Sequence, residues 1–238
     1  MTNSNSICNK RTRMSDQILK GLIYAAAGIA ILILIGIMGY VFVRGIPQIS
    51  WEFLTTVPST RKGTFGIIGN IVNTIYIIVI TLLIATPVGI GSAIYLNEYA
   101  KPGKFVRVIE FTTEILSGIP SIIFGLFGMV FFGVTLKLGY SILTGSFTLT
   151  LMILPLITRN TQEALKTVPD SYRSGALGIG ATKWYMIRTI LLPSAMPGIL
   201  TGVILAIGRI VGESAALLFT AGSGFLLPKN LFSKLFES

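Results

Sequence analysis

Two oppositely charged residues, Arg209 and Glu213, stand in an otherwise apolar stretch near the end of the chain. Their spacing predicts that they share one face of a helix and reach each other. A charge at the centre of a membrane span costs about 2.5–3.5 kcal/mol on insertion scales, so the pair is expected to face protein or a water-filled path. The planar guanidinium of Arg209 suits an oxyanion, because it donates two parallel hydrogen bonds, and Glu213 is expected to hold it until substrate arrives. A purely structural ion pair is the alternative.

Few other residues of the chain offer chemistry. There is no histidine, and Cys8 is the single cysteine, so neither a nucleophile–base pairing with histidine nor a zinc, iron or disulfide framework is predicted. The phosphate-binding pattern GxxxxGK[ST] does not occur in the sequence, which argues against nucleotide hydrolysis by that route. We therefore predict no catalytic residue, no metal site and no cofactor in this chain, which is not expected to be an enzyme.

A second candidate region is the Gly-broken, basic segment SYRSGALGIGATKWYMIRTILLP, residues 171–193, which lies between two apolar stretches. Proline and capping residues predict a helix, a turn and a second helix. Pro169 ends the preceding helix, Asp170 or Ser171 caps the first short helix, Gly178 and Gly180 permit a turn of positive φ, Thr182 caps the second helix, and Pro193 ends it.

The same segment carries an apolar face with a basic rim of Arg173, Lys183 and Arg188. One interpretation is an amphipathic element that lies on anionic lipid. The other is a protein interface, in which small residues allow close approach and Trp184 is an anchor. The residues alone leave both interpretations open.

The elements that must position these residues are membrane spans. Hydrophobic residues make up 52% of the 238-residue chain and charged residues 12%, and the mean hydropathy is +0.79. About 20 apolar residues cross a bilayer, which predicts an all-α polytopic membrane bundle of five spans, the fourth being the weakest because it is short and contains Pro155. The spans are Leu19–Val43, Ile67–Leu96, Phe111–Leu136, Ser141–Ile157 and Ala195–Phe219.

Two small-residue patterns concern the packing of these spans. Pro120 with Gly118 is expected to kink the third span. Close approach of the fifth span to a neighbour is predicted from two pairs of glycines, Gly198 with Gly202 and Gly208 with Gly212.

The basic residues indicate the orientation. The formal net charge is +10, but the charges are scattered between apolar runs and form no stripe of the kind that binds nucleic acid. Most of the 19 lysines and arginines fall on one side if the N-terminus is cytoplasmic, as the positive-inside rule requires. This places residues 1–18 in a cytoplasmic tail and residues 171–193 in the cytoplasm of a multi-pass protein.

The spacing of Gly180, Ile190 and Leu192-Pro193 resembles the cytoplasmic signature loop of ABC importer permeases. The resemblance implies that this loop couples transport to a separate ATP-binding subunit, which holds ATP and Mg. Ser174-Gly175-Ala176 stands where the family usually has Glu-Ala-Ala, so one polar contact to the ATPase is missing. The expected coupling residues are Arg173, Ser174, Gly175, Ala176, Gly180, Ala181, Trp184, Ile190, Leu192 and Pro193.

The chain is also similar to phosphate-specific ABC permeases, especially the second channel subunit. The similarity rests on residues 73–99, 116–128, 158–169 and 208–222. It implies a permease domain over residues 19–219 with a coupling loop at 158–193, and it implies that the region of Arg209 and Glu213 lines an anion pathway. The family normally has six spans, so the final span is expected to be missing, with residues 220–238 as an outer segment.

The resulting hypothesis is the channel subunit of an ATP-driven phosphate importer in the bacterial inner membrane. The implied partners are a second permease subunit, which is expected to form a heterodimer with this chain and to complete the pathway, an extracytoplasmic phosphate-binding protein and ATP-binding subunits. Three alternatives stay open: an ABC permease for another oxyanion or an organic anion, an ATP-independent anion carrier, and a membrane-anchored assembly protein in which the charges merely pair.

Overall fold

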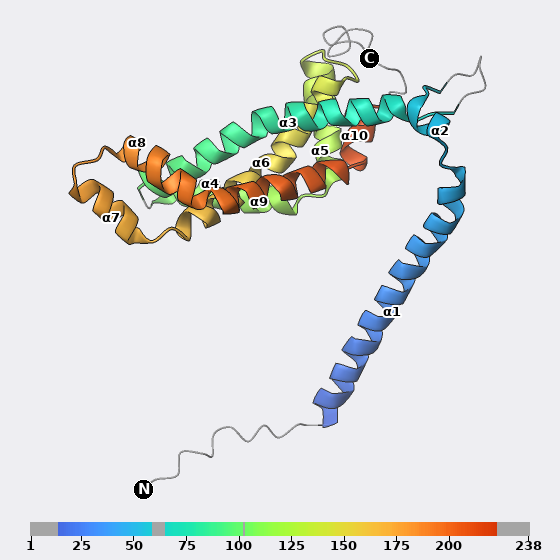
Figure 1. The fold of residues 1–238 in the computed structure, drawn as a ribbon, viewed down its shortest axis with the longest axis horizontal. Helices are drawn as coiled ribbons and strands as arrows, with labels where there is room; N and C mark the ends of the chain where they lie inside the picture. The colour runs from blue at the N-terminus through green and yellow to red at the C-terminus, as the bar shows by residue number, and fades with distance from the viewer. Residues whose placement is uncertain (1–13, 59–64, 102, 223–238) are drawn as a thin grey trace. The chain divides into compact units, whose positions relative to one another are not determined.

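The computed structural model describes residues 14–58, 65–101 and 103–222. Every regular element in these ranges is helical, as the apolar spans predict. The chain divides after Leu54 into two compact units, an N-terminal unit and a helical bundle that begins at Thr55. Figure 1 shows the course of the helices through both units.

The N-terminal unit consists mainly of α1 (Met14–Gly45), which is followed by a 3₁₀ turn, η1 (Ile46–Gln48), and α2 (Trp51–Thr55). Within its own unit α1 exposes side chains around nearly its whole circumference. The candidate span Asp16–Gln48 has none of its apolar window buried. A helix that is apolar on all sides and long enough to cross a bilayer is suited to lipid or to another helix.

The centre of the bundle is α6 (Ile142–Lys166), which packs against α3 (Ile68–Ile94) and α9 (Leu192–Val211). The side chain of Ser141 caps α6 by accepting the Thr144 N–H at 3.2 Å. This span has the least apolar sequence of the candidates but is the most buried, at 61% of its window. Some of its hydroxyls bond to carbonyls of their own helix, for example Thr148 to Thr144 at 2.7 Å, whereas the buried hydroxyls of Ser146 and Thr158 have no hydrogen-bond partner among the described residues.

The predicted third span is broken. The helix α4 (Lys104–Gly118) is followed by α5 (Ser121–Gly128) and a π-helical turn, η3 (Met129–Thr135), and the two halves are bent by 101°. The break lies at Ile119 and Pro120, where a kink was expected. It is far sharper than a kink, because Pro120 begins the new helix instead of bending the old one.

The fifth span has other bounds than those predicted. A continuous helical stretch, Lys183–Val211, comprises α8 (Lys183–Met186), a π-helical turn η4 (Ile187–Leu191) and α9. Pro193 does not end a helix here, contrary to the prediction. It occupies the first turn of α9, where its missing N–H costs little, and the preceding Leu192 N–H bonds to Ile187 in π geometry.

After α9 the chain forms a short separate helix, α10 (Ala215–Thr220), so the stretch Ala195–Phe219 is not one helix. The remaining elements are a π turn after α3, η2 (Tyr95–Tyr99), and α7 (Asp170–Gly178). The described residues hold 4 helices that are long and apolar enough to span a membrane, or up to 5 if the bent pair counts as one span.

One of the two predicted glycine pairs makes a close helix contact. A Cβ at Gly198 would lie 2.6 Å from that of Ala164, and one at Gly202 would lie 2.7 Å from that of Asn160. Both neighbours are on α6, so α9 approaches α6 closely through this pair. A Cβ at Gly208 would have nothing within 4 Å, so the second pair does not pack in this way.

Candidate functional site

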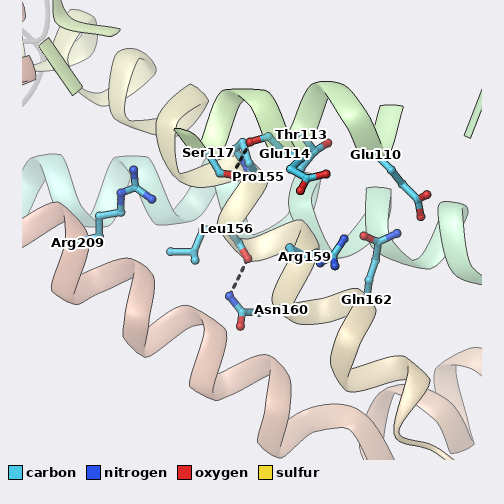
Figure 2. Close-up of a pocket in the computed structure, with 10 residues that line it drawn as sticks. All are labelled: Glu110, Thr113, Glu114, Ser117, Pro155, Leu156, Arg159, Asn160, Gln162 and Arg209. Carbon is cyan, nitrogen blue, oxygen red and sulfur yellow. Dashed lines mark hydrogen bonds between the residues drawn. The ribbon is translucent and has the colours of Figure 1, made fainter. Parts of the chain in front are cut away.

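A polar pocket lies between α4, α6 and α9, with a volume of about 290 Å³ (Figure 2). Five of its lining side chains are charged or amide groups on the inner faces of α4 and α6, and one arginine comes from α9. The lining residues are Glu110, Thr113, Glu114, Ser117, Pro155, Leu156, Arg159, Asn160, Gln162 and Arg209.

The α4 wall of the pocket is a polar stripe. Glu110, Thr113, Glu114 and Ser117 recur at the spacing that places residues on one face of a helix. Outside this stripe α4 exposes large apolar side chains, such as Phe105 and Phe111. The helix therefore presents two carboxylates and two hydroxyls to the pocket.

Arg209 lies in the last turn of α9, is partly buried and lines the pocket. The predicted pair with Glu213 is not formed, because α9 ends at Val211 and Glu213 lies beyond it. The Glu213 carboxylate instead accepts the Ala216 N–H at 3.0 Å, at the start of α10. Within the described part of the chain, the Arg209 side chain takes part in no ion pair or hydrogen bond. The two residues thus share neither a helix face nor a contact.

Arg159 is a pocket residue that the sequence analysis missed. It lies within α6 and lines the same pocket as Arg209. Its Nε donates to Glu163 Oε1 at 3.0 Å, and both side chains are 61% exposed. Arg159 follows the predicted span Ser141–Ile157 closely, but only the structure shows that the helix continues to Lys166 and so includes Arg159.

Arg173 has a different position from the one predicted. It was assigned to a basic rim that faces a partner, but its side chain is only 20% exposed and points into the bundle. Its Nη2 lies 3.0 Å from Glu98 Oε1 and 2.9 Å from the Leu165 carbonyl oxygen. Its Nη1 donates to the Val168 carbonyl at 3.0 Å and to Asp170 at 2.9 Å. Arg173 therefore ties α7 to the end of α6 and to the η2 turn.

The turn between α7 and α8 follows the prediction. Gly180 has a φ of +84°, and the Thr182 side chain caps α8 by accepting the Tyr185 N–H at 3.3 Å. Gly178 ends α7 without a positive φ. Lys183 lies 5.0 Å from the ring centre of Tyr99, which adds a cation–π contact between α8 and η2.

Most of the other expected coupling residues, together with Ile179, lie at the surface over a small buried core. Within the bundle, Ile179 is 87% exposed and Trp184 is 59% exposed, although both are large and apolar. Ala176 is buried against the segment's own small core, which includes Met186 and Leu191. Of the rest, Ser174, Gly175 and Pro193 are exposed, whereas Ala181, Ile190 and Leu192 are half-buried.

The side chains of these two regions are of kinds that suit binding. Neither region contains a nucleophile–base pair, and the described residues contain no group of three or more His, Cys, Asp or Glu side chains that would hold a metal ion. The pocket combines cationic donors with anionic acceptors, and the exposed apolar residues of α7 and α8 suit a protein partner.

Comparison with known proteins gives consistent matches. Residues 85–237 match the family described as "Binding-protein-dependent transport system inner membrane component". The chain is 39% identical to the "Probable ABC transporter permease protein YqgI" of Bacillus subtilis (strain 168), over 88% of this chain and 71% of that protein. It is 35% identical to the "Phosphate transport system permease protein PstA" of Pasteurella multocida (strain Pm70), over 93% of this chain and 78% of that protein.

A solved structure has the same fold. It shows an inward-facing conformation of the MetNI methionine ABC transporter, and its matching chain has a TM-score of 0.55 with 24% sequence identity. The match covers 67% of this chain and 74% of that one. At this level of identity the likeness concerns the fold alone.

Proposed function

The chain belongs to the family of inner membrane components of binding-protein-dependent transport systems, and on this premise we propose that it is a channel-forming subunit of an ATP-driven importer of inorganic phosphate. It is a multi-pass ABC permease and not itself a catalytic enzyme. The observation that carries the phosphate proposal is the pocket to which α6 and α9 each contribute one arginine. Relatives named as phosphate transport permeases support the same substrate.

The two arginines suit a tetrahedral oxyanion. Each guanidinium donates hydrogen bonds in a planar fork that matches two oxygens of a phosphate. Arg159 and Arg209 come from different helices, so the pocket offers an anion one guanidinium group from α6 and one from α9. A relative displacement of α6 and α9 changes this arrangement, which is the kind of change that alternating access requires.

ATP hydrolysis is assigned to a partner. We propose that two ATP-binding subunits, which carry ATP and Mg, dock on the exposed apolar residues of α7 and α8, among them Trp184. The Arg173–Glu98 ion pair then transmits their movement to the end of α3 through η2. In this arrangement α7 is cytoplasmic and so is the N-terminus. A second permease subunit completes the pathway, and an extracytoplasmic binding protein delivers phosphate.

The roles of the other expected coupling residues are part of this proposal. Gly180 and Ala181 shape the turn that enters the partner, while Ile190, Leu192 and Pro193 join it to the membrane span. Among the described residues, the Ser174 hydroxyl bonds to carbonyls of its own helix, those of Asp170 and Ser171. A serine cannot supply the carboxylate contact of a glutamate, so we expect docking to rest on the apolar residues.

A permease for another oxyanion or an organic anion is the second candidate, because guanidinium groups bind carboxylates as well as phosphate. The substrate is tested by ATP-dependent uptake of radiolabelled phosphate into proteoliposomes that contain the complete complex. Unlabelled sulfate, molybdate and carboxylates are added as competitors. We expect uptake of phosphate that none of these competitors suppresses.

The role of Arg209 is tested in the same assay with Arg209→Lys, which keeps the charge and loses the fork. We expect uptake to fall by about tenfold, the effect of one lost charge-assisted hydrogen bond. Arg107→Lys is the matched control, because Arg107 is exposed on α4 and does not line the pocket. Equal uptake by both variants would show that the anion does not depend on Arg209.

A further inference from the structure

The charges of the pocket are largely unpaired. Within the described part of the chain, the side chains of Arg209, Glu110 and Glu114 take part in no ion pair or hydrogen bond, although all three line one cavity of about 290 Å³. Arg159 has a partner, Glu163, but that pair is exposed and is worth little. Two cations and two carboxylates therefore face the same space without neutralising each other directly.

This combination restricts the ligand that fits. An arginine only donates hydrogen bonds and an ionised carboxylate only accepts them. A ligand that satisfies both must carry acceptor oxygens and a donor proton. Hydrogen phosphate and hydrogen arsenate have both, because they keep a P–OH or As–OH group near neutral pH. Sulfate is fully ionised there and has no proton to donate, so a carboxylate beside it is left without a partner and repels it.

The position of Glu114 makes it the better acceptor of the two. In Figure 2 the Glu110 side chain lies toward Gln162 at one end of the pocket, while Arg209 enters at the other end. Glu114 lies between these ends, beside Thr113 and above Arg159. Glu114 thus lines the same cavity as Arg159 and Arg209, and an oxyanion that enters the cavity shares it with the Glu114 carboxylate.

From this geometry we infer that Glu114 is a specificity-determining residue, which selects a protonated tetrahedral oxyanion over a fully ionised one inside the permease itself. The inference rests on the proposed function and deepens it. The anion is then selected twice, by the extracytoplasmic binding protein and by the permease. A substrate that lacks the proton leaves the Glu114 carboxylate unpaired, and we expect a discrimination of about tenfold or more.

The test must bypass the binding protein, so the competing anion is placed inside the vesicle. Proteoliposomes with the complete complex take up radiolabelled phosphate, which the binding protein delivers from outside. The lumen is loaded with unlabelled phosphate or with sulfate at graded concentrations. An internal anion that occupies the pocket slows uptake. We expect half-inhibition by sulfate only at about tenfold higher concentration than by phosphate.

Three variants sharpen the test. Glu114→Gln keeps the shape, removes the charge and offers N–H donors to sulfate, so the two internal anions should inhibit at nearly equal concentration. Glu114→Asp keeps a carboxylate and should keep the preference for phosphate. Asp16→Asn is the matched control, since it removes one exposed carboxylate from α1, outside the pocket, and should leave the tenfold ratio unchanged.

The outcomes separate this inference from the proposed function. If the assembled wild-type complex takes up no phosphate, the phosphate importer proposal fails and the inference fails with it. If uptake is normal but internal sulfate and phosphate inhibit equally, or neither inhibits, the inference is wrong and the function stands. The inference is likewise overturned if Glu114→Gln retains the full preference for phosphate.

Discussion

Arg173 and Arg209 are two arginines of one bundle with opposite surroundings. Arg173 uses its guanidinium fully, with Glu98, Asp170 and two backbone carbonyls within 3.2 Å. Arg209 has no such partner in the described part of the chain, and it borders a cavity. The first arginine holds the fold together, and the second is available to a ligand. The two roles are distinguished by how many N–H donors of each guanidinium group have an acceptor, and not by charge or burial alone.

The ends of two helices explain the difference. The carbonyls of Leu165 and Val168, at the end of α6 and just beyond it, accept from Arg173, which satisfies groups that a helix end leaves open. At the end of α9, the backbone N–H groups of Gly212 and Glu213 already bond to the carbonyls of Gly208 and Ile210. These two carbonyls are thus satisfied by the backbone and not by the Arg209 side chain.

We expect the largest loss of stability for Arg173→Ala. The Glu98 side chain is only 5% exposed, and removal of its partner leaves a buried charge, which costs about 3–5 kcal/mol. Thermal unfolding of the detergent-solubilised complex should show a clear loss of stability. The double variant Glu98→Gln with Arg173→Gln should recover part of it. If the free energy of unfolding falls by less than about 1 kcal/mol, the Arg173–Glu98 ion pair does not stabilise the fold appreciably.

A smaller effect on stability is expected for Arg209→Ala. Because no partner is left unpaired, the free energy of unfolding should change by no more than about 1 kcal/mol, while phosphate uptake falls. The same thermal unfolding experiment measures the first quantity, and Arg209→Met controls for the lost length of the side chain. If Arg209→Ala destabilises as much as Arg173→Ala, the contrast between the two arginines does not hold.

The smallest effect is expected for Glu163→Gln, which breaks the exposed pair with Arg159. Exposed pairs at this spacing contribute about 0.3–0.5 kcal/mol, and salt screens them. Unfolding of this variant and of the wild type should therefore differ slightly at low salt and coincide at high salt. A large difference that persists in high salt would show that Arg159 is held in place by Glu163, as Arg173 is by Glu98.

Much of the architecture follows from local sequence. Apolar length predicts α1, α3 and α6, Ser141 and Thr182 cap the helices they precede, and Gly180 provides the positive φ of the turn. These features depend on a few neighbouring residues, whose conformational preferences are strong. The close approach of α9 to α6 through Gly198 and Gly202 was likewise predictable from residue size.

Two predictions were wrong for the same reason: the pairing of Arg209 with Glu213, and the end of a helix at Pro193. Local pattern allows Arg209 and Glu213 to share a helix, and it allows Pro193 to end one. The structure ends α9 at Val211 and lets Glu213 cap the start of α10, while the η4 turn carries the helix on into Pro193. In each case two local conformations are acceptable, and packing against other helices selects one.

The sequence by itself therefore determined a helical membrane protein, its main spans and the turn at Gly180, since apolar length and capping act over short distances. Only the tertiary structure decided which charges meet. It brought Arg159 of α6, Arg209 of α9 and the α4 carboxylates to one pocket, and it paired Arg173 with Glu98 across 75 residues of chain. Such contacts depend on how distant helices pack, and no spacing along the chain encodes them directly.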